Sequence, residues 1–172
     1  MSTKHVVILK NDAVGDLVHS LKSIYNITNN NDFNKITIFV SKLSKKFDFL
    51  FKNSKVNTKV MNYNLTVLEK LNLFLFFLFN RIDRVYILSP KNFYYYLPLF
   101  FFRTKFYALC VDNVGGYKRP SLFLRKFLFK YLINDRSAVF KRKSTAEIQN
   151  ELTKKANEIN NQIKIRTNFS DK

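Results

Sequence analysis

The sequence predicts an α/β fold in which helices cover both faces of an open parallel sheet. Short runs of β-branched and aliphatic residues alternate with longer amphipathic or apolar segments five times between residues 4 and 111. Such alternation is typical of parallel strands joined by helical crossovers. The chain has 172 residues, which suits one domain of ordinary size with a substantial buried core.

The expected elements follow in order along the chain. Strands are expected at 4–10, 35–40, 56–61, 84–88 and 106–111, where β-branched or apolar residues run together. Helices are expected at 16–27, 41–51, 65–80, 91–102, 121–133 and 144–160. Ser41 and Asn64 are the expected N-caps of the second and third helices, and Pro120 suits the first turn of the fifth. The last helix is polar with a thin apolar stripe, so we expect it to pack against another element.

Composition limits the classes of function. The formal net charge of +18 points to a polyanionic partner, namely nucleic acid, an anionic membrane or a phosphorylated glycolipid. Lys, Asn, Ile and Phe are heavily used throughout, so part of this charge is compositional background. The single cysteine, Cys110, excludes an internal disulfide, and with only His5 and His19 beside it a Cys/His-rich metal centre is excluded as well. No secretory signal precedes the first strand, so a cytoplasmic chain is expected.

Two apolar runs, 71–79 and 93–102, are each about half of the roughly 20 residues that a membrane-spanning helix needs. Charged residues flank both runs. We therefore expect core helices whose aromatic faces can touch lipid.

The turn after the first strand carries the candidate chemistry, because open α/β sheets bind ligands at the carboxyl ends of their strands. Residues 11–16 hold one glycine and two acids, which excludes a glycine-rich dinucleotide turn, and no Gly-Lys-Ser/Thr phosphate loop occurs in the chain. Two interpretations of Asp16 stay open: a carboxylate that caps the helix, or a general base facing the crevice. Asp12 is a competing carboxylate, and His19 lies about one helical turn beyond Asp16 on the same face.

A family resemblance bears on this turn. Residues 6–10, followed by Gly15, Asp16 and the apolar segment to 21, resemble the opening of glycosyltransferase family 9, the ADP-heptose:lipopolysaccharide heptosyltransferases. Residues 35–41, 81–88, 102–108 and 136–159 are similar to later segments of that family in the same order. The chain departs from it at residues 11–13, which replace small hydroxyl residues, and at Lys22, where proline is usual.

The resemblance implies an inverting reaction that needs no metal or cofactor, with Asp16 as the base that deprotonates the acceptor hydroxyl. It places Lys10 near the acceptor and donor phosphates, and Asp12, Gly15 and His19 among the substrate-binding residues. The implied acceptor is a lipid A-linked sugar of the lipopolysaccharide core, at the cytoplasmic side of the inner membrane.

The same resemblance sets the expected domain organisation. These enzymes have the GT-B architecture of two Rossmann-like domains, the first holding the acceptor and the second the nucleotide-sugar. Residues 1–134 are therefore expected to form a Rossmann-like acceptor-binding domain, and 135–172 a polar helix and tail leading towards a missing second domain. We expect a truncated or partial chain that does not turn over alone, because the nucleotide-sugar donor binds only where a second domain is supplied.

A basic surface is expected on the fifth helix. Arg125, Lys126 and Lys130 alternate there with aromatic residues, as on a helix that lies against an anionic inner leaflet. In the alternative interpretation the aromatics belong to the core and the cations are merely solvated.

The sequence leaves two alternative functions open. A non-enzymatic basic module that binds nucleic acid or an anionic membrane surface is the main alternative. No RNA-binding signature with ordered aromatic strands occurs, so nucleic acid is not the expected partner. A receiver-like or flavodoxin-like domain is the weaker one, because residues 61–64 at the third strand lack the second acidic site of a receiver.

Overall fold

The computed structural model describes residues 4–51, 53–110, 123, 129–134, 147, 150–155 and 157–158. Its strands are β1 (His5–Lys10), β2 (Lys35–Ser41), β3 (Val56–Met61), β4 (Arg84–Ile87), β5 (Lys105–Cys110) and β6 (Phe129–Asn134). They form one sheet in the order β3-β2-β1-β4-β5-β6, and every neighbouring pair is parallel. This is the strand order of the Rossmann fold, so the predicted fold class is confirmed.

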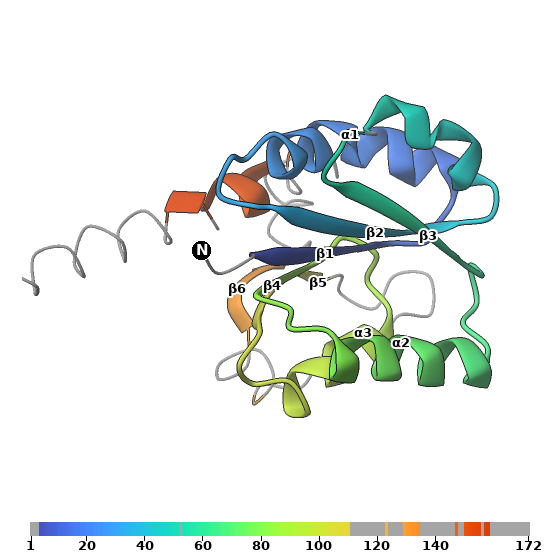
Figure 1. Cartoon of the computed structure of the whole chain (residues 1–172), viewed down its shortest axis with the longest axis vertical. Coiled ribbons are helices and arrows are strands. Elements are labelled where there is room, and N and C mark those ends of the chain that lie inside the picture. The colour runs from blue at the N-terminus through green and yellow to red at the C-terminus, as the bar shows by residue number, and fades with distance from the viewer. Residues whose placement is uncertain are drawn as a thin grey trace, which may run out of the picture.

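Helices cover both faces of the sheet (Figure 1). The helical elements are α1 (Val14–Thr28), the 3-10 helix η1 (Ser44–Leu50), α2 (Val67–Phe79), α3 (Asn92–Tyr96) and the 3-10 helix η2 (Leu97–Leu99). α1 and the teal η1 lie on one face, and α2 and α3 lie on the other. The layering follows from the crossovers, because each connection between parallel strands must pass over one face of the sheet.

The core divides into two clusters, one on each face, because side chains alternate along a strand. Val6 and Ile8 of β1 pack with Leu17 and Ile24 of α1. Val7, on the opposite side of the same strand, belongs to the cluster under α2 and α3. All six residues of β1 are buried, as a central strand of a doubly covered sheet requires.

Two of the expected helices are shorter than the sequence pattern indicated. The segment expected at 41–51 forms only the 3-10 helix η1, and its Ser44 N–H donates to Ser41 Oγ at 3.2 Å. The helix expected at 91–102 ends as an α-helix at Tyr96. Pro98 explains this end, because proline provides no N–H for the helical ladder.

The N-cap of α2 is Thr66 and not the expected Asn64. Thr66 and Glu69 form a capping box: Glu69 N–H donates to Thr66 Oγ1 at 3.2 Å, and Thr66 N–H donates to the Glu69 carboxylate at 2.9 Å. The hydroxyl and the carboxylate each accept from one helix-end amide, so the pair satisfies two amides at once. Asn64 has no such partner, because Val67 stands three residues after it.

We expect Thr66→Ala to lower the free energy of unfolding by about 1 kcal/mol, because the Glu69 amide loses its acceptor. Urea denaturation measures the difference. Asn64→Ala is the matched control and should leave the midpoint unchanged. An equal loss in both variants would contradict the assignment of the cap.

The prediction of a helix at 121–133 is wrong for residues 129–133. Residues 129–134 form strand β6, which pairs with β5 at the edge of the sheet. Phe106 pairs with Phe129 and Tyr107 with Tyr131, so Lys130 is an extra residue at a register shift. The aromatic and β-branched residues of this run suit a strand once β5 offers an edge to pair with, and that partner is not visible in a local pattern.

The last expected helix packs on the α1 side of the sheet. Residues 150–155 and 157–158 are helical, and Leu152 is fully buried in the cluster that contains Leu17 and Ile24. Asn26 Nδ2 of α1 donates to Asn150 Oδ1 at 2.8 Å. The expectation that this helix packs against another element is confirmed for the described residues, while its continuation towards a second domain stays a prediction.

Candidate functional site

The candidate site lies where the strand order reverses, between β1 and β4. The connections after these strands leave in opposite directions, to α1 on one face and to α3 on the other, which opens a crevice at their carboxyl ends. The N–H groups of Leu88 and Ser89 both donate to Leu9 O at 3.1 Å, so the end of β4 is fastened to the end of β1. The residues after β1 therefore occupy the position at which this fold binds ligands.

Asp16, Gly15 and His19 are all exposed in the first two turns of α1. The helix begins at Val14 with Ala13 as N-cap, and no side chain makes a cap hydrogen bond, so the interpretation of Asp16 as a side-chain cap is wrong. Asp16 is the acidic residue of the first turn, where its charge complements the helix dipole. A Cβ added at Gly15 would meet no atom within 4 Å, so packing does not require glycine there and the surface beside Asp16 is open.

Lys10 and Asp12 form a buried ion pair beneath this turn. Lys10 Nζ donates to Asp12 Oδ2 at 2.8 Å, and the two side chains are only 2% and 9% exposed. Burial lowers the pKa of Lys10, while the nearby Asp12 and Asp16 carboxylates raise it. Lys10 is therefore placed to hold the turn, and its predicted contact with phosphates stays a prediction.

A second buried contact fixes the turn to the neighbouring loops. Asn11 is fully buried, its Nδ2 donates to Asn62 O at 2.7 Å, and the Tyr94 hydroxyl donates to its Oδ1 at 2.7 Å. Burial is the main reason that the pKa of Tyr94 is raised, so this hydroxyl stays a donor. Asn11 thus joins the turn after β1 to the loop after β3 and to α3.

Lys91, from the connection after β4, lies beside the same buried pair. Its Nζ donates to Tyr63 O and lies 4.2 Å from the centroid of the Tyr63 ring. Burial and the Lys10 charge lower the pKa of Lys91, while the Asp12 carboxylate raises it. The charges of Lys10 and Asp12 therefore both act on Lys91. A hollow of about 280 Å³ opens here, lined by Tyr63, Asn64, Leu65, Lys70, Lys91, Asn92 and Phe93.

Two buried oxygens at this end of the sheet, Asp12 Oδ1 and Ser89 Oγ, make no hydrogen bond in the part of the chain that the structure describes. Over the same residues, no group of three or more His, Cys, Asp or Glu side chains could hold a metal ion. The site offers carboxylate, ammonium and aromatic groups.

Sequence reasoning singled out Lys10, Asp12, Gly15, Asp16 and His19, which lie at the end of β1, in the turn after it and in the first two turns of α1. Their roles stay predictions. Sequence reasoning missed Asn11, Ser89, Lys91 and Tyr94. A polar residue directly after a buried strand could have drawn attention to Asn11. Nothing in the local pattern distinguishes Tyr94 from its aromatic neighbours.

The predicted basic surface is described at only one of its three residues. Arg125 and Lys126 lie outside the described residues, and Lys130 belongs to strand β6 instead of a helix. Their contact with an anionic surface stays a prediction.

No family model matches the chain, and no curated protein matches it. Among solved structures, the E. coli heptosyltransferase WaaC with ADP-2-deoxy-2-fluoro heptose is similar, with a TM-score of 0.49, 13% sequence identity and 88% of this chain covered. The chain spans 47% of the length of that protein.

Proposed function

We propose that this chain binds the sugar acceptor of an inverting glycosyltransferase and supplies Asp16 as the catalytic base. One observation carries the proposal. Asp16 is an exposed carboxylate in the first turn of α1, at the point where the strand order reverses, and its charge acts on the buried Lys10 ammonium. A carboxylate held there by a rigid strand and helix can meet a ligand that enters the crevice.

In the proposed reaction an acceptor hydroxyl lies within hydrogen-bond distance of Asp16. The acceptor oxygen attacks the anomeric carbon of a nucleotide-sugar from the face opposite the nucleotide. The new glycosidic bond forms as the bond from that carbon to the diphosphate oxygen breaks, and the nucleotide leaves with the electron pair. Asp16 takes the hydroxyl proton, and the configuration at the anomeric carbon inverts.

The proposed acceptor is a phosphorylated glycolipid, such as a lipid A-linked sugar of a lipopolysaccharide core. The hollow of about 280 Å³ suits a sugar, because Tyr63 and Phe93 offer aromatic faces to its C–H groups while Lys70 and Lys91 bring positive charge. A second domain, on the same or another chain, would hold the nucleotide-sugar. Such an acceptor would place the protein at the cytoplasmic face of the inner membrane.

The proposal is tested with a deacylated, soluble core oligosaccharide, so that adsorption to lipid cannot imitate binding. Titration followed by NMR should shift the amide signals of Gly15, Asp16 and His19. Gly15→Leu places a side chain in open space beside Asp16, and we expect it to weaken binding about tenfold or more without loss of stability.

The matched control for this titration is Asp32→Asn, which should bind normally. Asp32 lies in the loop that enters β2, at the amino ends of the strands and so opposite the crevice. Signal changes confined to other faces, or equal affinity in the wild type and Gly15→Leu, would overturn the proposed acceptor site.

A further inference from the structure

α2 carries apolar residues on nearly every side, although only one side packs against the sheet. It buries Leu73 and Phe77 against the sheet. Its outer side is largely apolar, and the exposed apolar residues are Val67, Leu68, Leu71, Leu75, Leu78 and Phe79. A helix at the surface of a water-soluble domain normally carries charged and polar residues on the side away from the core.

The segment between η2 and β5 extends this apolar surface. Phe100 and Phe102 are 60% and 79% exposed, and Phe79 at the end of α2 is also 79% exposed. Phe74 joins the two segments, because its ring centroid lies 5.4 Å from that of Phe100. We call this surface the aromatic face and define it by Leu71, Leu75, Leu78, Phe79, Phe100 and Phe102.

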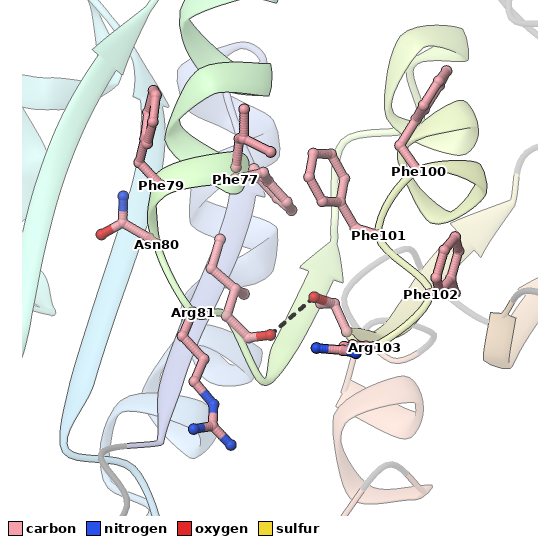
Figure 2. Close-up of a pocket in the computed structure, with 11 residues that line it drawn as sticks. Phe77, Phe79, Asn80, Arg81, Phe100, Phe101, Phe102 and Arg103 are labelled. Carbon is pink, nitrogen blue, oxygen red and sulfur yellow. Dashed lines mark hydrogen bonds between the residues drawn. The ribbon is translucent and has the colours of Figure 1, made fainter.

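A hollow of about 350 Å³ lies at the end of the aromatic face, between the end of α2 and the segment before β5. Figure 2 shows the phenyl rings of Phe100, Phe101 and Phe102 along one wall, with Arg81 and Arg103 towards one end. Both arginines are exposed, and neither forms an ion pair with any of the described residues.

None of the described residues that line the hollow is acidic. The nearby Asp83 accepts a hydrogen bond from the backbone N–H of His5 at 2.8 Å. The aromatic face therefore ends in two positive charges that remain available to an anion.

We propose that the aromatic face docks on the surface of an anionic phospholipid bilayer. The leucine and phenylalanine side chains enter the boundary between headgroups and acyl chains, and Arg81 and Arg103 bind lipid phosphates. Exposed aromatic and aliphatic side chains next to unpaired guanidinium groups provide both contributions that hold a protein on such a surface. Arginine suits this position because its planar guanidinium binds phosphate through two hydrogen bonds.

A bilayer fits this surface better than a second copy of the chain. Two copies of the chain each carry a net charge of +18 and repel one another, whereas an anionic bilayer attracts the chain. No helix of the described residues is long and apolar enough to cross a membrane. The inference does not depend on the proposed glycosyltransfer.

The chain contains no tryptophan, so a single introduced tryptophan reports on its own surroundings. In Phe102→Trp, vesicles of phosphatidylcholine with a minority of phosphatidylglycerol should shift the emission to shorter wavelength, and brominated lipids should quench it. Phe49→Trp is the matched control, because Phe49 is 66% exposed on η1, on the other face of the sheet. Its emission should stay unchanged.

Paired variants separate local docking from net charge. We expect Phe79→Ser/Phe102→Ser to weaken vesicle binding about tenfold or more at about 0.15 M salt, while Phe49→Ser binds like the wild type. Arg81→Glu/Arg103→Glu should weaken binding more than Lys42→Glu/Lys46→Glu, which changes the net charge equally on the η1 side.

Several results would overturn the proposal. Equal losses in the two charge variants would show that binding follows net charge alone. An unshifted Phe102→Trp emission would show that the aromatic face does not enter lipid. A dimer in light scattering that Phe79→Ser/Phe102→Ser dissociates would assign the face to a second copy of the chain.

Discussion

Asp12→Ala is expected to lower the free energy of unfolding by about 3–5 kcal/mol, because it leaves the buried Lys10 ammonium without its partner. Lys10 Nζ then keeps only a long contact of 3.4 Å to Leu88 O. Such a loss is a large share of the stability of an ordinary domain. Urea denaturation at neutral pH measures it.

The chain supplies a matched control for this result. Lys45 and Asp48 form an ion pair whose side chains are 43% and 20% exposed. Asp48→Ala should therefore cost less than about 1 kcal/mol, since water stabilises the remaining lysine. Lys10→Met/Asp12→Leu should recover most of the stability that Asp12→Ala loses, because an apolar pair needs no solvation. Equal losses from Asp12→Ala and Asp48→Ala would contradict the burial of the first pair.

The loss in Asp12→Ala should also depend on pH. Burial lowers the pKa of Lys10, and Asp12 opposes this, so removing Asp12 lowers that pKa further. Between the lowered pKa and the ordinary pKa of lysine, the unfolded chain binds more protons than the folded chain, so stability rises with pH. We therefore expect Asp12→Ala to regain part of its lost stability as the pH is raised from 7 towards 10. A loss that stays constant over this range would contradict the role of the Lys10 charge.

Asp16→Asn is expected to reduce sugar transfer about 10²–10⁴-fold once the chain is joined to a donor-binding domain, because the amide cannot accept the hydroxyl proton. Binding of the soluble acceptor should change by less than about threefold, since an amide still forms hydrogen bonds. This separation of rate from affinity distinguishes a base from a residue that only binds.

Asp32→Asn is the control for this assay, and its transfer rate should equal that of the wild type. Equal stability of the two variants in urea excludes unfolding as the cause of any difference. An unchanged rate in Asp16→Asn would remove Asp16 from the proposed reaction. The acceptor site could then still be supported by the Gly15→Leu titration.

Part of the candidate site was predictable and part was not. Gly15 and Asp16 could be placed at the turn between the first strand and the first helix, because both elements show clear periodicity on either side of it. The burial of Asp12 could not be predicted, because it depends on two contacts of Lys10. Lys10 pairs with Asp12 beneath the turn, and it also contacts the backbone at the end of β4. The contact between Asn11 and Tyr94 joins residues 83 positions apart, and no local pattern carries such information.

The sequence by itself determined the α/β class and the places of the first five strands, because runs of β-branched and apolar residues are local signals of buried parallel strands. Only the tertiary structure decided which strands are neighbours, that 129–134 forms the edge strand β6, and that Thr66 instead of Asn64 caps α2. It also decided that Lys10 and Asp12 are buried together while one side of the apolar α2 faces solvent. Strand partners and burial depend on contacts between residues far apart in the chain, whereas periodicity reports only the shape of each segment.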